Sequence, residues 1–167
     1  MPSIRIDQQL SDRIYFLTLT VKNWYYLFDR HNRFQILADS LVYCQKEKGL
    51  RIYCYVFMLN HLHFIANAPD MIGFVRDFKK FTSKEIQKNI IAYEPTILRL
   101  FETQTGSYEF WAKTNMPKMI ETETYLVQKI NYIHYNPVRK QYVQKPEDWI
   151  WSSANPGSSI IIQPLPV

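Results

Sequence analysis

The stretch LRIYCYVFMLNHLHFIANA, residues Leu50–Ala68, decides the fold of this chain. β-branched and aromatic residues fill two runs within it, Leu50–Met58 and His61–Ala68, and this composition predicts two strands. Only Leu59 and Asn60 separate the runs, which is the length of a tight turn. The stretch therefore predicts an antiparallel hairpin.

Strand and helix patterns alternate on either side of this hairpin. The predicted elements are a strand over Tyr15–Val21, a helix over Phe28–Lys48, the hairpin, a helix over Met71–Ile91, a loop with a helical turn over Ile91–Thr105, a strand over Tyr108–Ala112 and a closing helix over Glu121–Tyr135. We expect Pro137 to fix the end of the closing helix. The order predicts an α+β, ferredoxin-like (RRM-like) fold, an antiparallel sheet with helices on one face plus a closing helix.

Length and composition indicate one packed domain. The chain has 167 residues, of which 47% are hydrophobic, and a net charge of +5. We expect the domain to span residues 1–153 and residues 154–167 to form a tail. The apolar runs are too short for a membrane span, and the polar start does not resemble a signal peptide, so we expect a cytoplasmic protein without a membrane partner. Cys44 and Cys54 lie in apolar contexts and are expected to be buried free thiols.

A pair of histidines lies on the second strand of the hairpin. Residues two apart on a strand point to the same face, so His61 and His63 could aim at one point. Neutral imidazole is the commonest protein metal ligand. A pair of this kind also arises as ordinary surface polarity, so the pattern by itself leaves both interpretations open.

The closing helix carries a second candidate group. Tyr132 and Asn136 are four residues apart and share a face that differs from the apolar stripe of that helix. Tyr132 fits either a nucleophile beside a metal ligand or a tyrosine packed at the edge of the core. Lys129, Arg139 and Lys140 make this segment basic, which favours phosphate contacts or a solvated surface.

A further basic face is expected on the helix over Met71–Ile91. It includes Lys79 and Lys80, for which DNA contact and a solvated surface are equally open.

Three blocks of this sequence together resemble the HUH single-tyrosine transposases (insertion-sequence-200-like), in their REP-associated branch. Met58–Phe64 (MLNHLHF) is similar to a Met-Pro-Asn-His-x-His block, and Asn131–Lys140 (NYIHYNPVRK) to a Tyr-Ile-x-x-Asn-Pro-Val-Arg block. Lys145–Ala154 (KPEDWIWSSA) is similar to the stretch that follows in that branch. This chain departs from the pattern at Leu59, where proline is usual, and at Gln141, where glycine is frequent.

The resemblance implies a chemistry and a set of roles. Tyr132 would be the nucleophile that forms a 5′-phosphotyrosine link and leaves a free 3′ hydroxyl. His61, His63 and Asn136 would hold a divalent metal, Mg²⁺ or Mn²⁺. The implied partner is single-stranded DNA near a hairpin, REP-like or at a transposon end, in a bacterial, nucleoid-associated setting. Relatives often act as homodimers.

We therefore carry three functional hypotheses. The first is a metal-dependent transposase that cleaves and rejoins single-stranded hairpin DNA, with Arg139, Lys140, Lys129, Lys79 and Lys80 as candidate DNA contacts. The second is a non-catalytic hairpin-binding module with a relict site. The third is a phosphodiesterase with water as nucleophile, which needs a general base; Asp70 is the acid nearest to the histidine pair in the sequence.

Overall fold

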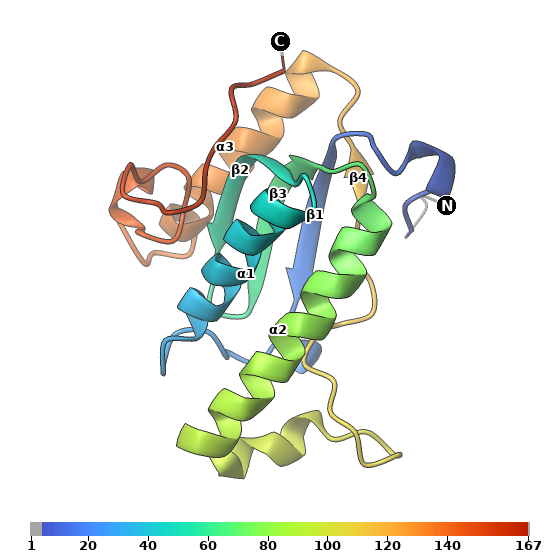
Figure 1. The fold of residues 1–167 in the computed structure, drawn as a ribbon. Coiled ribbons are helices and arrows are strands. Elements are labelled where there is room, and N and C mark those ends of the chain that lie inside the picture. Colours follow the sequence, from blue (N-terminus) through green and yellow to red (C-terminus); the bar gives the residue numbers. More distant parts are fainter. Residues whose placement is uncertain (1–4, 167) are drawn as a thin grey trace.

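The structure, a computed structural model, describes residues 5–166 and is built on a four-stranded antiparallel sheet. The strands β1 (Tyr15–Thr20), β2 (Arg51–Phe57), β3 (His61–Asn67) and β4 (Lys118–Met119) lie in the order β2-β3-β1-β4 (Figure 1). The predicted hairpin of β2 and β3 is confirmed, and the Met58 amide donates to the His61 carbonyl across its turn at 2.7 Å.

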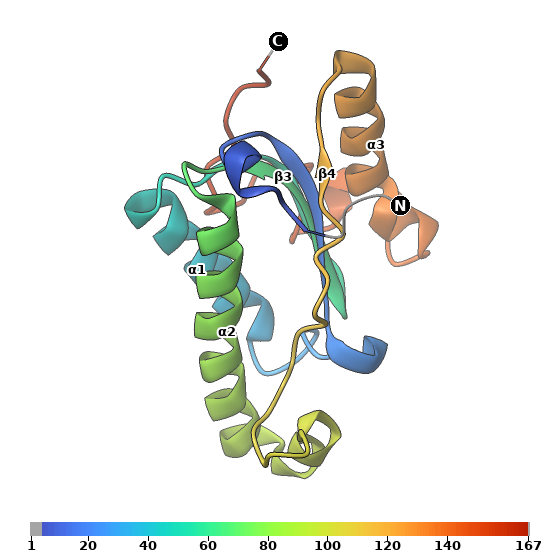
Figure 2. The same ribbon diagram turned by 90° about the vertical axis from the view of Figure 1, so that its right-hand side faces the viewer.

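Three long helices cover the two faces of this sheet. Helices α1 (Arg33–Glu47) and α2 (Met71–Tyr93) lie on one face, and α3 (Glu123–Arg139) lies on the other (Figure 2). The α+β ferredoxin-like arrangement is confirmed, with the closing helix alone on its own face. Within the described residues, no helix combines the length and apolar character needed to span a membrane.

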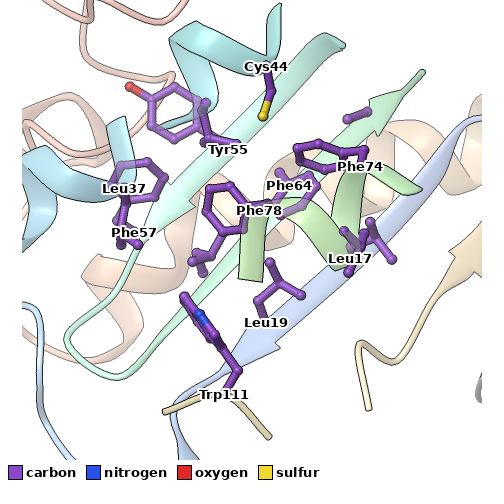
Figure 3. Packing of buried hydrophobic residues seen from close by; sticks show 14 of the residues in the cluster. Leu17, Leu19, Leu37, Cys44, Tyr55, Phe57, Phe64, Phe74, Phe78 and Trp111 are labelled. Atoms are coloured by element: carbon purple, nitrogen blue, oxygen red, sulfur yellow. The ribbon is translucent and has the colours of Figure 1, made fainter. Parts of the chain in front are cut away.

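The main core lies between the sheet and the α1–α2 pair. Leu17, Leu19 and Phe64 from the strands pack there against Phe74 and Phe78 of α2 (Figure 3). Side chains alternate along a strand, so Phe16 and Ile65 face the other way and pack under Leu126 and Ile133 of α3.

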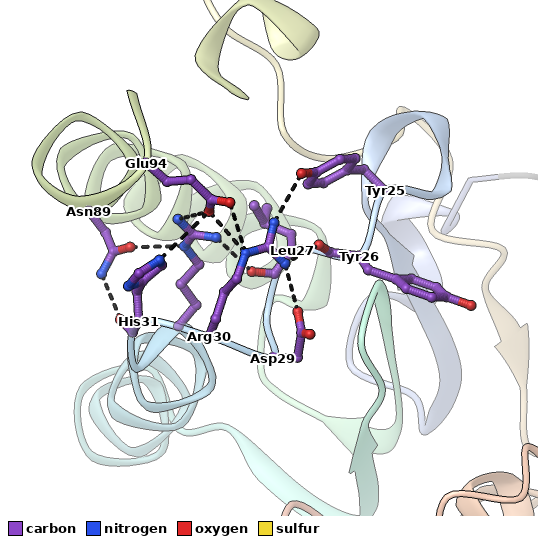
Figure 4. Close-up of polar contacts among 9 residues, drawn as sticks. Tyr25, Tyr26, Leu27, Asp29, Arg30, His31, Asn89 and Glu94 are labelled. Carbon is purple, nitrogen blue, oxygen red and sulfur yellow. Dashed lines mark hydrogen bonds and ion pairs between the residues drawn. The ribbon is translucent and has the colours of Figure 1, made fainter. Parts of the chain in front are cut away.

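A buried ion-pair cluster joins the start of α1 to the end of α2. Arg33 is fully buried, with Nη2 2.9 Å from Glu94 Oε2, and its Nε donates to Asn89 Oδ1 at 2.9 Å. Arg30 Nε pairs with the same carboxylate at 3.0 Å (Figure 4). Burial raises the pKa of the Glu94 carboxyl, but hydrogen bonds from Arg30 and Arg33 outweigh burial and leave that pKa below its usual range. The cluster fixes the loop before α1, so the helix begins at Arg33 rather than at the predicted Phe28.

The predicted strand over Tyr108–Ala112 is wrong in position. The fourth strand is Lys118–Met119, and the earlier segment makes only isolated bridges, from Trp111 to Val21 and from Tyr108 to Glu102. Phe110 and Trp111 are adjacent yet both buried in the main core. Neighbouring side chains of a regular strand point to opposite faces, so a regular strand could not bury both of these residues in the same core.

The predicted end of the closing helix is also wrong. α3 continues through Pro137 to Arg139. A proline so near the helix end removes a single hydrogen bond, and the end is closed instead by the Tyr142 amide, which donates to the Pro137 carbonyl at 3.0 Å. Gln141 has a φ of 61°, the left-handed conformation that glycine adopts most readily. Glycine, which the transposase pattern has at this position, would adopt this conformation without strain.

The final segment of the chain lies against the free edge of β2. Ile160 is buried in the main core, and the Gln163 amide donates to the Ile52 carbonyl at 2.8 Å. An isolated parallel bridge joins Ile162 to Ile52. Ile160 and Ile162 therefore attach the final segment to the chain's own sheet, whereas Ile161 between them is exposed.

Candidate active site

The histidine pair faces α3 from the centre of the sheet. In the register of the β1–β3 ladder, His61 lies opposite Thr20 and His63 opposite Thr18. Both imidazoles are buried, and their ring centroids are 4.8 Å apart. The prediction that the two rings share a face and converge is confirmed.

Asn60 fixes the orientation of the first imidazole. Its Nδ2 donates to the Trp24 carbonyl at 3.0 Å, which leaves its Oδ1 facing His61 Nδ1 at 2.7 Å. A carbonyl oxygen only accepts, so this contact assigns the proton of His61 to Nδ1 and leaves the Nε2 lone pair free. A partner that fixes the tautomer in this way is usual behind a metal-ligating histidine.

Thr18 serves the second imidazole. Its Oγ1 lies 2.9 Å from His63 Nδ1, and the ring stacks on Phe16 with centroids 5.3 Å apart. Within the described residues, neither histidine Nε2 has a hydrogen-bond partner. Each ring is thus held through Nδ1 and has its other nitrogen available.

Burial keeps both histidines uncharged. Burial lowers the pKa of His61 to about 4, and the Lys140 ammonium adds to the effect. For His63, burial and then the neighbouring His61 lower the pKa to about 3. Both rings are therefore neutral near pH 7, the state in which imidazole binds a metal.

Tyr132 projects from α3 over the histidine pair. Its ring meets the ring of His63 edge to face, with centroids 5.2 Å apart at 70°, and the side chain is 40% exposed. Two cations flank this ring: Lys129 Nζ lies 5.3 Å from its centroid and Arg139 Cζ lies 4.8 Å from it. A partly exposed tyrosine ring thus lies close to an imidazole and to two positive charges.

Asn136 lies one helical turn beyond Tyr132, on the same side of α3. Tyr132 contacts His63, and Lys140, one turn after Asn136, is close enough to His61 to lower its pKa. Asn136 is therefore on the turn of α3 that faces the pair. It is buried, and within residues 5–166 its carboxamide has no hydrogen-bond partner.

This donor set fits a divalent cation. Two neutral imidazoles on β3 and a carboxamide on the facing turn of α3 supply nitrogen and oxygen donors. Imidazole and carboxamide are uncharged donors, and among the described residues no group of three or more His, Cys, Asp and Glu side chains could hold a metal. Nitrogen ligands suit Mn²⁺ better than Mg²⁺, which prefers an all-oxygen shell.

The other two lysines of the predicted set lie elsewhere. Lys79 and Lys80 belong to α2, on the opposite face of the sheet. Lys79 Nζ donates to the Ala112 carbonyl at 2.8 Å, and burial lowers the pKa of this amine to about 8. The structure brings Lys129, Arg139 and Lys140 to the histidine pair but not these two.

His134 takes part in a separate buried cluster. Its Nε2 lies 2.8 Å from Ser153 Oγ and 3.3 Å from Cys54 Sγ, between α3 and β2. Burial raises the pKa of the Cys54 thiol to about 12 and that of the Cys44 thiol to about 11. The expectation of buried free thiols is confirmed.

Sequence reasoning missed three residues that support the site: Asn60, Thr18 and Phe16. The alternation of Tyr15–Val21 held a signal, because its polar positions Thr18 and Thr20 share one face. Polar residues inside an apolar strand indicate that the face they share serves something other than core packing.

Comparison with known proteins agrees with this architecture. No protein-family model matches the chain, and no curated protein matches it. A solved structure of a REP-associated tyrosine transposase bound to a REP hairpin matches with a TM-score of 0.69 and 18% sequence identity. The match covers 92% of this chain and 82% of the transposase chain. The chain therefore shares its fold with a REP-associated tyrosine transposase.

Proposed function

We propose that this protein is a metal-dependent, single-tyrosine DNA transesterase of the HUH transposase type, which cleaves and rejoins single-stranded DNA beside a hairpin. The observation that carries the proposal is the contact between Tyr132 and the histidine pair, with 5.2 Å between the Tyr132 and His63 rings. These two residues are 69 positions apart in the chain, and they belong to different elements, β3 and α3. Their convergence with two cations is what attack on a phosphodiester requires.

The reaction assigned to Tyr132 is an in-line displacement at phosphorus. Its phenol oxygen forms a bond to the phosphorus, and the bond from phosphorus to the 3′ oxygen breaks. The phenol proton is lost to solvent, and the leaving 3′ oxygen takes up a proton as it becomes a hydroxyl. A 5′-phosphotyrosine remains, and attack by a DNA hydroxyl reverses the step and rejoins a strand.

The surrounding side chains bind and orient the phosphate. Lys129 and Arg139 both lie close to the Tyr132 ring, where they attract the DNA backbone. Asn60 and Thr18 hold the two imidazoles in one orientation. A divalent cation held by His61, His63 and Asn136 would neutralise phosphate charge.

Hairpin DNA is the proposed partner. The structural neighbour is bound to a REP hairpin, and the basic residues of α3 provide phosphate contacts on the same side as Tyr132. A homodimer stays a prediction from the resemblance.

The alternative with water as nucleophile has little support. Asp70 caps α2 by accepting from the Gly73 amide at 2.9 Å, and it also accepts from Ser11 Oγ at 3.2 Å. This carboxylate is at the start of a helix on the opposite face of the sheet from the histidine pair. It therefore cannot serve as the general base at that pair.

Covalent trapping tests the proposal and separates it from a non-catalytic hairpin binder. The protein is mixed with Mn²⁺ and labelled hairpin DNA from repeats flanking its gene, and adducts are resolved on a denaturing gel. We expect an adduct with the native protein and with Tyr135→Phe, whose tyrosine is also exposed on α3. Tyr132→Phe should form none and still bind DNA.

Two results would count against the proposal. An adduct that persists in Tyr132→Phe would show that another residue is the nucleophile. Tight hairpin binding by the native protein with no adduct in Mn²⁺ or Mg²⁺ would favour the non-catalytic binder.

A further inference from the structure

Trp24 is the most exposed tryptophan of the described chain and lies beside the histidine pair. Its side chain is 64% exposed, whereas Trp111 is buried and Trp149 and Trp151 are half-buried. Its ring meets the ring of His61 edge to face, with centroids 6.2 Å apart at 69°. A large aromatic surface is thus open to solvent directly beside His61, a proposed metal ligand.

The backbone holds this tryptophan in an unfavourable conformation. Asn23 and Trp24 have φ values of 60° and 57°, in the left-handed region that bulky residues rarely adopt. Strained residues of this kind concentrate at ligand-binding sites. Little burial compensates the strain here, because most of the indole is in water.

Asn60 couples the position of Trp24 to that of His61. One carboxamide donates to the Trp24 carbonyl at 3.0 Å and contacts His61 Nδ1 at 2.7 Å. The Trp24 amide also donates to the Val21 carbonyl at 3.0 Å, at the end of β1. The backbone of Trp24, from which the indole projects, is therefore held at a fixed place relative to His61.

The positive charge around the histidine pair, which Trp24 adjoins, fits a nucleic acid better than an apolar protein segment. Lys140 is close enough to lower the pKa of His61, and Arg139 and Lys129 flank Tyr132. Exposed aromatic rings beside phosphate-binding cations are the usual platform for unpaired bases.

We propose that Trp24 is a base-stacking subsite, on which the unpaired nucleobase next to the phosphate attacked by Tyr132 rests. This inference deepens the proposed function and rests on it. Stacking there holds the single strand so that its backbone passes over His61 and His63. Stacking accepts every base, so the subsite fixes the position of the strand and does not read its sequence.

Binding without cleavage tests the subsite. In the Tyr132→Phe background, we measure the affinity for the hairpin oligonucleotide with single-stranded arms, and the quenching of tryptophan fluorescence on binding. We compare Trp24→Asn, since asparagine tolerates the left-handed conformation, with Trp24→Phe, which keeps a ring. Tyr43→Ala is the matched control, because Tyr43 is equally exposed but lies on α1 on the opposite face.

We expect Trp24→Asn to weaken binding about 10-fold and to remove most of the quenching. Trp24→Phe should retain most of the affinity, and Tyr43→Ala should change neither measurement. We also measure binding of oligonucleotides that each lack one base. The protein with Trp24 should bind more weakly when the missing base is at one particular position of the arm. For Trp24→Asn, loss of the base at that position should make no difference.

Three outcomes overturn this inference. The first is that Trp24→Asn leaves the affinity and the quenching unchanged. The second is that Trp24→Asn responds to a missing base at the same arm positions as the protein with Trp24. The third is that the Tyr132→Phe parent does not bind the DNA, which would also overturn the proposed function. Failure of the proposed function alone is distinguishable, because stacking would then persist while the native protein forms no adduct.

Discussion

The two faces of the sheet in this protein are built from alternate residues of the same strands, yet they differ in chemistry. Leu17, Leu19 and Phe64 face α1 and α2 in an apolar core. Thr18 and His63, each adjacent to one of those residues, face α3 with polar side chains. A strand can thus serve folding and chemistry together, because its side chains alternate between two environments.

The largest expected effect is the difference between substitutions at two neighbouring positions of β3, one facing each side of the sheet. Phe64→Ala should lower the free energy of unfolding by about 3–5 kcal/mol, because it removes a fully buried ring. His63→Leu keeps a similar side-chain volume but leaves the Thr18 hydroxyl without its partner, so it should lower that free energy by only about 1–3 kcal/mol. It should abolish Mn²⁺ binding. Urea unfolding and titration calorimetry measure the two quantities. If His63→Leu destabilises as much as Phe64→Ala, the polar face is a second structural core.

The second effect is a pH dependence confined to the polar face. The pKa values of His61 and His63 are about 4 and about 3 in the folded protein, below the roughly 6.5 of an unfolded histidine. The unfolded chain therefore binds more protons, and stability falls as the pH drops below about 6.5, until the folded-state values are reached. The slope is at most about 1.4 kcal/mol per pH unit for each ring.

Urea unfolding in a chelator at about pH 6.5 and 5.5 measures this slope, and the two rings should cost about 2 kcal/mol between these values. The double variant His61→Leu/His63→Leu should remove most of the loss. His134, whose pKa burial also lowers, accounts for the remainder. An unchanged slope in the double variant would mean that the two imidazoles are not held neutral by the fold.

The smallest effect compares the basic residues of the two faces. Lys140→Ala should weaken binding of single-stranded DNA a few-fold and reduce the salt dependence of log K by about 0.7, because it removes one phosphate contact. Lys80→Ala on α2 should change neither quantity. Fluorescence anisotropy over a series of salt concentrations measures both. Equal losses in the two variants would show that DNA also contacts the α1–α2 face.

Much of the fold could be predicted from local sequence patterns, and the predictions that were wrong concerned local features. The hairpin and the order of elements were predictable because periods of two and of about 3.6 residues reflect strand and helix geometry. A strand was wrongly predicted around Phe110 and Trp111, because a single sequence does not show that both side chains are buried in the same core. Pro137 was expected to end α3, but a proline in the last turn costs little.

The candidate site was predictable only in parts. Spacing placed His61 with His63 and Tyr132 with Asn136, but each pair fitted a structural role equally well. The contact between Tyr132 and His63 depends on which face of the sheet α3 covers. That choice is made by the packing of Leu126 and Ile133 on Phe16 and Ile65, far away in sequence.

The sequence by itself determined the strand–turn–strand unit, the shared face of the two histidines and the helical face that carries Tyr132, because backbone geometry sets these relations within a few residues. Only the tertiary structure decided that the two faces meet, that Asn60 orients His61, and that Trp24 stands exposed beside it. Those relations come from long-range packing, which depends on how the whole chain buries its apolar surface.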